Sequence, residues 1–133
     1  MAIKLLVVDD EQDIEMLFRQ RLRKLLKEEL IEIQFAFSGE EALRYLSEME
    51  EPDIALILSD INMPGMSGFE LLQRVKAKFP EMKVMMITAY GDEEHQEKAR
   101  ALGAYDFLTK PLDFKELELR LLNAENNEDE SEA

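Results

Sequence analysis

The 133-residue chain contains no cysteine, so it can form neither disulfide bonds nor a thiolate metal site. No apolar run is long enough to span a bilayer. Residues 1–8 are too short, and are followed too soon by acids, to be a signal peptide. These absences argue against a secreted or membrane-spanning protein. The sequence instead favours a soluble protein of a reducing compartment, the cytoplasm.

Positive charge is scarce: 16 Lys and Arg residues stand against 30 Asp and Glu residues, for a formal net charge of -14. Binding of nucleic acid requires clustered cations that displace counterions, so we expect no direct contact with nucleic acid or with anionic lipid. One local concentration of positive charge is predicted to be a solvated helix face. Its members are Arg19, Arg21, Arg23, Lys24 and Lys27.

The length of the chain fits a single domain, and an apolar content of 46% is enough to build a core. We predict that residues 1–122 form this domain. Residues 123–133 are acidic and contain no large apolar side chain, so they are predicted to form a disordered tail.

Five short segments have the patterns of β-strands. Residues 3–8, 54–58 and 84–88 are almost continuous apolar runs, which are typical of parallel strands covered on both faces. Residues 31–37 alternate between apolar and polar, and residues 104–108 are short and aromatic. These two patterns are typical of strands nearer the edge of a sheet.

Segments with helical periodicity separate the strands, beginning with residues 14–26. Capping boxes at Ser38 and Ser67 open the next two helices. A polar helix is expected over residues 92–102, and a last, lightly held helix with a weak apolar stripe over residues 113–122. Regular alternation of strand and helix predicts an α/β doubly wound sandwich with right-handed crossovers.

Charged and hydroxyl side chains stand at or just after the ends of four of the five predicted strands: Asp9, Asp10, Asp60, Thr88 and Lys110. Because the carboxyl ends of parallel strands share one edge of a sheet, these groups are expected to meet. Two carboxylates about 4 Å apart repel by roughly 4 kcal/mol at an effective dielectric constant near 20, so such a cluster protonates or binds a cation. Mg²⁺ fits best because it takes one or two carboxylates and completes its shell with water and phosphate oxygens.

The charge balance of this group favours phosphoryl transfer. Three carboxylates are offset by Mg²⁺ and Lys110, which leaves the site near neutral. An acyl phosphate on Asp60 would remove one charge and add about -2. The cation, Lys110 and the hydroxyl of Thr88 would then stabilise the new oxygens. Carboxylates are known nucleophiles in reactions of this kind.

Four segments, in this order along the chain, resemble the receiver domains of two-component response regulators. They are LVVDDE at residues 6–11, LSDINMPGMSG at 58–68, MITA at 86–89 and GAYDFLTKP at 103–111. The resemblance runs from Ile3 to about Leu122 and implies a flavodoxin-like fold with strand order 2-1-3-4-5 and five helices. It also implies a switch, not a turnover enzyme, in which Asp60 receives phosphate from a histidine kinase, a phosphotransfer protein or a small phosphodonor.

The resemblance further implies the metal ligands. Asp10 and Asp60 would bind Mg²⁺ through their side chains, and Asp9 would act mainly through metal-bound water. Asn62 would offer its backbone carbonyl, so replacement of its side chain need not abolish metal binding.

A second set of residues would report phosphorylation. By resemblance, Lys110 contacts the phosphoryl oxygens, and the bond before Pro111 is expected to be cis. Thr88 and Phe107 match the family's switch pair, in which the hydroxyl turns toward the phosphoryl group and the ring moves inward. Taken alone, Phe107 is equally consistent with an ordinary core aromatic. Tyr105 is the weaker candidate because its spacing to Lys110 does not match.

The surface expected to change comprises the helix at 92–102, the strand at 104–108 and the helix at 113–122. Through it the domain would control a downstream protein or a missing output domain, and phosphorylation-dependent homodimers would use the same face. His95, the one histidine, is interpreted as solvent-facing and without a role. Tyr90 is hypothesised to screen the acyl phosphate from water.

Three alternatives share part of the pattern. A Mg²⁺-dependent aspartate-nucleophile phosphatase of the haloacid dehalogenase type needs a second acid two residues after the nucleophile, where Asn62 cannot act as acid or base. An FMN-binding flavodoxin needs a Ser/Thr/Gly-rich loop where Asp9 and Asp10 stand. The third is a phosphorylation-independent, receiver-like interaction module, which the presence of every expected site residue argues against.

Overall fold

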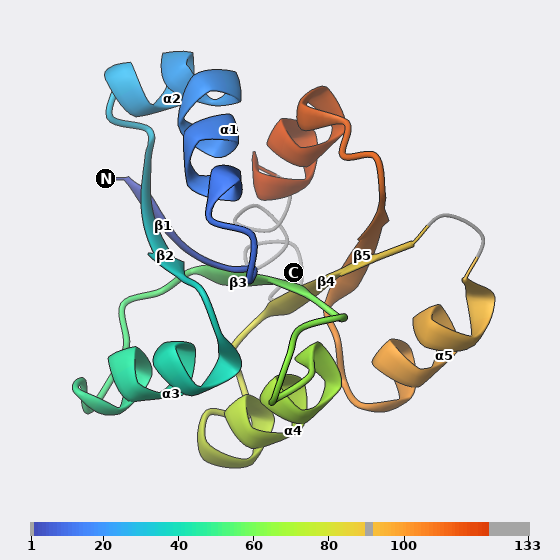
Figure 1. Cartoon of the computed structure of the whole chain (residues 1–133). Coiled ribbons are helices and arrows are strands. Elements are labelled where there is room, and N and C mark those ends of the chain that lie inside the picture. Colours follow the sequence, from blue (N-terminus) through green and yellow to red (C-terminus); the bar gives the residue numbers. More distant parts are fainter. Residues whose placement is uncertain (1, 90–91, 123–133) are drawn as a thin grey trace, which may run out of the picture.

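Five parallel strands form one sheet in the order β2-β1-β3-β4-β5 (Figure 1). The structure is a computed structural model, and it describes residues 2–89 and 92–122. The strands are β1 (Ile3–Val8), β2 (Ile31–Ala36), β3 (Leu56–Asp60), β4 (Val84–Thr88) and β5 (Asp106–Thr109). The predicted strand order and the predicted edge positions of β2 and β5 are therefore confirmed. Tyr90 and the acidic tail, residues 123–133, lie outside the described residues.

Helices cover both faces of the sheet, as the doubly wound pattern predicts. They are α1 (Asp13–Arg21), α2 (Arg23–Lys27), α3 (Gly39–Ser47), α4 (Gly68–Lys78), α5 (Glu93–Ala101) and a C-terminal helix at residues 114–122. Figure 1 shows α1, α2 and the C-terminal helix on one face, and α3, α4 and α5 on the other. Among the described residues, no helix has the length and apolar character of a membrane span.

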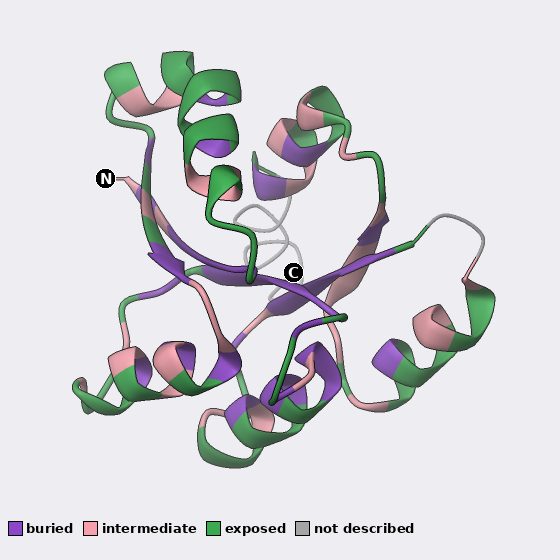
Figure 2. Cartoon of the chain, viewed as in Figure 1, coloured by how far each residue is buried: buried purple, intermediate pink, exposed green. Residues whose placement is uncertain are grey.

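Two hydrophobic clusters, one on each face, hold the helices to the sheet. One cluster joins Leu6, Val8 and Met86 to α3, α4 and α5, and the other joins Leu5 and Val7 to α1 and the C-terminal helix. Buried residues therefore run continuously along the central strands β1, β3 and β4 (Figure 2). Apolar side chains on both faces explain why these strands are nearly uninterrupted apolar runs.

The predicted capping residues begin the helices. The Ser38 hydroxyl accepts the backbone N–H of Glu41 at 3.0 Å, and the Ser67 hydroxyl accepts that of Glu70 at 3.2 Å. At the C-terminal helix, one oxygen of Asp113 accepts the N–H groups of residues 115 and 116. Each cap satisfies N–H groups that have no partner within the helix.

The single helix predicted over residues 14–26 is wrong, because the chain leaves helical geometry at Leu22 (φ -105°, ψ 19°) and divides it into α1 and α2. Leu22 nevertheless stays fully buried, and its N–H still bonds the carbonyl of Phe18 at 2.9 Å. The helix is therefore interrupted at Leu22, while the Leu22 side chain stays packed in the core.

Two strands are displaced toward the carboxyl edge from their predicted bounds. β3 extends to Asp60 because Ser59 and Asp60 pair with Met86 and Ile87 of β4. β5 begins only at Asp106, because the preceding residues close α5: Gly103 has φ +97° and the N–H of Ala104 bonds the carbonyl of Ala99. A positive φ at this point is a common way to end a helix.

The C-terminal helix is held more firmly than its weak apolar stripe predicts. Leu117 and Leu121 are almost fully buried against the sheet. Arg120 forms ion pairs with Asp106 of β5 and with Glu116 of its own helix. Two well-placed leucines and a link to the edge strand therefore secure this helix.

Candidate functional site

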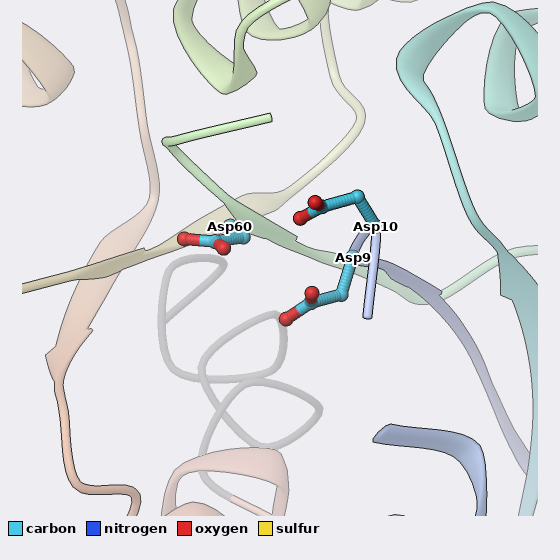
Figure 3. Close-up of side chains that lie close together, drawn as sticks. All are labelled: Asp9, Asp10 and Asp60. Atoms are coloured by element: carbon cyan, nitrogen blue, oxygen red, sulfur yellow. The ribbon is translucent and has the colours of Figure 1, made fainter. Parts of the chain in front are cut away.

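Three carboxylates gather at the carboxyl edge of the sheet. Asp9 and Asp10 directly follow β1, and Asp60 is the last residue of β3 (Figure 3). One oxygen from each lies within 4.8 Å of one from each of the others. Asp9 and Asp60 are buried, with 3% and 4% of their surface exposed, whereas Asp10 is exposed. The predicted convergence of these acids is therefore confirmed.

Close packing fixes the backbone of Asp60. Its strand neighbour Ser59 is fully buried and donates its hydroxyl to the Asp60 carbonyl at 3.0 Å. The N–H of Gly68, the first residue of α4, bonds the carbonyl of Ile61 at 2.8 Å. A Cβ at Gly68 would stand 2.3 Å from the Asp60 carbonyl oxygen, so only glycine allows α4 to begin here.

A lysine from the edge strand completes the charged group. Lys110 Nζ lies 3.2 Å from Asp60 Oδ2, and the Lys110 backbone N–H bonds the carbonyl of Thr88 at 2.8 Å. The peptide bond between Lys110 and Pro111 is cis, as expected. The end of β5 is thereby held against β4, with the ammonium group directed at the carboxylate of Asp60.

Burial and neighbouring charges perturb two of these groups. Burial raises the pKa of Asp9, and the nearby Asp60 carboxylate adds to the increase, although the N–H of Glu11, 2.9 Å from Asp9 Oδ1, acts against it. Burial acts to lower the pKa of Lys110, but attraction to Asp60 and the hydrogen bond with it outweigh this and raise the pKa. The lysine therefore stays protonated beside the acids.

The chemistry of these donors fits a hard divalent cation. Oxygen ligands in a compact acidic group are those that Mg²⁺ prefers, and an exposed carboxylate, Asp10, leaves one side open to water and phosphate. Two carboxylate oxygens that lie within 4.8 Å of each other repel by roughly 3 kcal/mol or more at an effective dielectric constant near 20. Lys110 offsets part of this repulsion, and a divalent cation would offset the rest.

Thr88 and Phe107 lie on neighbouring strands behind the charged group. Thr88 is buried and donates its hydroxyl to the carbonyl of Leu108 at 3.4 Å. Phe107 is half-buried against the cluster that contains α3, α4 and α5, and the Arg100 guanidinium lies 5.3 Å from its ring centroid. Tyr105 packs on the opposite face of the sheet. Phe107 thus has both an apolar interior side and an exposed side.

Asn62 is exposed in the loop after β3. His95, which was interpreted as solvent-facing, keeps 34% of its side-chain surface exposed, and its ring also lies edge-on to Phe69 at 5.3 Å. Its Nδ1 lies 2.7 Å from Asp92 Oδ2, without the alignment of a hydrogen bond.

Comparison with known protein families agrees with the site that the geometry indicates. The model of the response regulator receiver domain matches residues 5–122. The chain belongs to this family. Receiver domains are generally phosphorylation-controlled signalling switches without turnover activity, and they typically bind Mg²⁺ at an acidic pocket.

Solved structures that resemble this receiver domain include both short chains and part of a long one. A receiver domain protein of Clostridium thermocellum is 32% identical, with a TM-score of 0.80, and the match covers 96% of this chain and 97% of that one. The Vibrio cholerae chemotaxis protein CheY4 is 28% identical, with a TM-score of 0.79 and coverage of 93% and 99%. NtrX of Brucella abortus is 33% identical, with a TM-score of 0.78, and the match covers 99% of this chain but 29% of NtrX.

Sequence reasoning missed two residues that position the receiver site. Gly68 was assigned only to a capping box, although its close approach to Asp60 is what places α4. Ser59 was given no role, although it is buried within β3 and donates its hydroxyl to the Asp60 carbonyl. Gly68 was itself the available signal, because glycine lacks a Cβ and so allows two backbone segments to approach closely.

Proposed function

We propose that this receiver domain accepts a phosphoryl group on Asp60 in a Mg²⁺-dependent reaction. The observation that carries the proposal is the environment of Asp60. Its carboxylate is almost buried, meets the Lys110 ammonium at 3.2 Å, and lies within 4.8 Å of two further carboxylates. An acidic group of this kind, with one cation already supplied by the protein, has a place for a second cation and for the oxygens of a phosphoryl group.

The metal would be held mainly by Asp10 and Asp60, through their side chains. Asp9 would contribute through metal-bound water and Asn62 through its backbone carbonyl. When bound, Mg²⁺ supplies positive charge that stabilises the phosphoryl oxygens during transfer. Two features support this assignment: the carboxylate oxygens lie close together, and Asp10 is exposed to solvent.

Asp60 supplies the nucleophile. One carboxylate oxygen attacks phosphorus, a new C–O–P linkage forms, and the bond from phosphorus to the donor breaks, so the donor leaves with that electron pair. The negative charge of Asp60 is lost and about two charges arrive with the phosphoryl group. The Lys110 ammonium, already beside Asp60, then pairs with a phosphoryl oxygen.

Thr88 and Phe107 would carry the change outward. The Thr88 hydroxyl now donates to the carbonyl of Leu108. On phosphorylation it would turn toward a phosphoryl oxygen, and the ring of Phe107 would fill the vacated space, leaving the Arg100 guanidinium behind. This movement would alter the surface formed by α5, β5 and the C-terminal helix, which would control a downstream protein or an output domain.

The phosphate would come from a histidine kinase, a phosphotransfer protein or a small phosphodonor. A pull-down that compares the protein with and without beryllofluoride and Mg²⁺ would identify partners of the changed surface. A copy of the same chain recovered in this way would indicate phosphorylation-dependent homodimers.

A direct test is incubation with acetyl phosphate and Mg²⁺, followed by measurement of the intact mass. We expect one added phosphoryl group in the wild type and none in Asp60→Asn, which removes the nucleophile and keeps the size of the side chain. Equal modification of the two proteins would overturn the proposal. A turnover assay with a generic phosphate ester should give no product; steady turnover would favour the phosphatase alternative.

A further inference from the structure

The surface of α1 and α2 carries a concentration of positive charge that the phosphorylation site does not use. Five basic residues lie between positions 19 and 27, and no acidic residue occurs from position 16 to position 27. This is the opposite of the chain as a whole, whose formal net charge is -14. We define the basic patch as Arg21, Arg23, Lys24 and Lys27, all of which are exposed.

The four residues of the basic patch are unpaired within the described part of the chain, where no carboxylate lies within ion-pair distance of them. Other cations differ: Arg74 lies 3.1 Å from Glu70, and Lys4 lies 3.0 Å from Asp53. Arg19 is excluded from the basic patch because its Nε lies 3.1 Å from Glu15. The charge of the basic patch is therefore open to an anionic partner.

The C-terminal helix lies directly beside the basic patch. The Arg21 guanidinium lies 5.7 Å from the ring centroid of Phe114, and this ring meets Phe18 of α1 edge-on at 5.1 Å. Figure 1 shows the C-terminal helix next to α1 on the same face of the sheet. The C-terminal helix begins beside Arg21, and its described residues, 114–122, span about 14 Å, so Leu122 lies within roughly that length of the level of Arg21.

Eleven residues follow Leu122, and none of them is basic. Five are acidic: Glu125, Glu128, Asp129, Glu130 and Glu132. A segment of this length can extend to about 36–40 Å, and a flexible one has a root-mean-square span of about 18 Å. α1 is nine residues long, or about 14 Å. The acidic residues can therefore reach every member of the basic patch.

We propose that the acidic tail, residues 123–133, binds the basic patch of α1 and α2 in the same molecule. A single exposed ion pair is weak. The tail is tethered beside the basic patch, however, which gives an effective concentration in the millimolar range. This inference is independent of phosphorylation at Asp60.

The absence of cysteine allows a selective test in the full chain. Ser131→Cys introduces one thiol, to which a spin label is attached, and amide signals are recorded with the label oxidised and reduced. We expect loss of signal at residues 21–27 in about 0.01 M salt, where the screening length is about 30 Å, and recovery in about 1 M salt, where it is about 3 Å. Broadening centred on α3 or α4 would overturn the proposal.

Matched variants test whether the broadening depends on the charges of the tail and the basic patch, or only on the attachment of the tail nearby. Replacement of the five tail acids by Gln or Asn keeps the tail length and should restore the signals of residues 21–27, as should Arg21, Lys24 and Lys27→Glu. Arg44 and Lys78→Glu, on the other face, should leave the broadening unchanged. Broadening that persists in the neutral tail would contradict the proposal. So would broadening of an unlabelled ¹⁵N protein mixed with a spin-labelled one, because it would show binding between molecules.

Discussion

The Lys110 ammonium lies 3.2 Å from Oδ2 of Asp60, and it is the cation that the protein itself supplies to an otherwise acidic edge of the sheet. Asp60 is the last residue of β3 and Lys110 directly follows β5, and β4 lies between these two strands. Their contact therefore depends on the correct order and register of three strands. The positive charge of Lys110 should therefore have two opposite effects: it competes with Mg²⁺ for the acids, and it stabilises the phosphoryl oxygens.

Replacement of Lys110 by Met should separate these effects. The variant keeps the length of the side chain but loses the ammonium group, so phosphoryl oxygens on Asp60 lose one stabilising charge. By analogy with other oxyanion donors, we expect phosphorylation by acetyl phosphate to slow by about 10²-fold or more. Mg²⁺ should bind at least as tightly, because a competing cation has gone.

Intact mass over time and calorimetric titration with Mg²⁺ measure the two quantities. Lys110→Arg, which keeps the charge with a different shape, is the control and should retain more activity than Lys110→Met. An unchanged phosphorylation rate in Lys110→Met would show that the contact with Asp60 has no part in the reaction.

The ionised carboxylate of Asp9 should lower the free energy of unfolding when no divalent cation is present. Its folded-state pKa is raised, chiefly by burial, so the folded protein holds its proton more tightly than the unfolded chain does. The ionised carboxylate is therefore unfavourable in the fold at neutral pH, and the penalty disappears as the pH falls through the raised pKa.

Asp9→Asn keeps the oxygen that accepts the Glu11 N–H and removes the charge. We expect it to raise the free energy of unfolding at pH 7 in EDTA by an amount on the order of 1–3 kcal/mol, because it removes a buried charge and its repulsion of Asp60. The gain should shrink in acid, and Mg²⁺ should stabilise the variant less than the wild type. Urea unfolding with EDTA or Mg²⁺ measures this; a variant less stable than the wild type in EDTA at pH 7 would contradict the role given to burial.

Gly68 should not tolerate a methyl group. A Cβ there would lie 2.3 Å from the Asp60 carbonyl oxygen and 2.8 Å from Cα of Ile61, both of which are backbone atoms. Gly68→Ala should therefore destabilise the fold by about 1–3 kcal/mol and lower phosphorylation by moving Asp60.

Gly39→Ala is the matched control. Its Cβ would lie 2.7 Å from Sδ of Met66, the flexible end of a side chain that can move aside. Denaturant unfolding should show the smaller loss for Gly39→Ala. A loss of stability no greater for Gly68→Ala than for this control would contradict the tight approach of α4 to β3.

Coupling between Thr88 and Phe107 can be tested through the aromatic ring. Beryllofluoride with Mg²⁺ should shift the ring signals of Phe107 in the wild type, since the ring moves inward from Arg100. Thr88→Val keeps the shape of residue 88 and removes its hydroxyl, so the shift should be lost, at a cost in stability of about 0.5–1.5 kcal/mol. Thr88→Ser should retain the shift. An equal shift in Thr88→Val would show that the ring moves without the hydroxyl.

The resemblance to receiver domains implied the strand order, and the sequence itself predicted the convergence of Asp9, Asp10, Asp60 and Lys110 because the carboxyl ends of parallel strands share one edge of a sheet. It could not place the carboxyl end of β3, because the pairing of Asp60 with Ile87 depends on the register between strands. A prediction that treats each strand separately puts Asp60 in a loop, whereas Asp60 is part of the strand and almost buried.

Other features depend on tertiary contacts that a local pattern does not contain. The break at Leu22 occurs inside a regular apolar stripe, and nothing in that stripe marks the position of the turn. His95 lies among acidic neighbours in the sequence, and its contact with Phe69 joins two different helices. The half-buried position of Phe107 likewise depends on Arg100 and on the packing of α5.

The most direct test of the central claim is to locate the phosphoryl group within the chain. The protein is incubated with acetyl phosphate, with Mg²⁺ or with EDTA, and the modified residue is identified by peptide mapping under conditions that preserve acyl phosphates. We predict one phosphoryl group, on Asp60, that forms with Mg²⁺ and not in EDTA. Modification at another residue, or equal modification in EDTA, would contradict the claim.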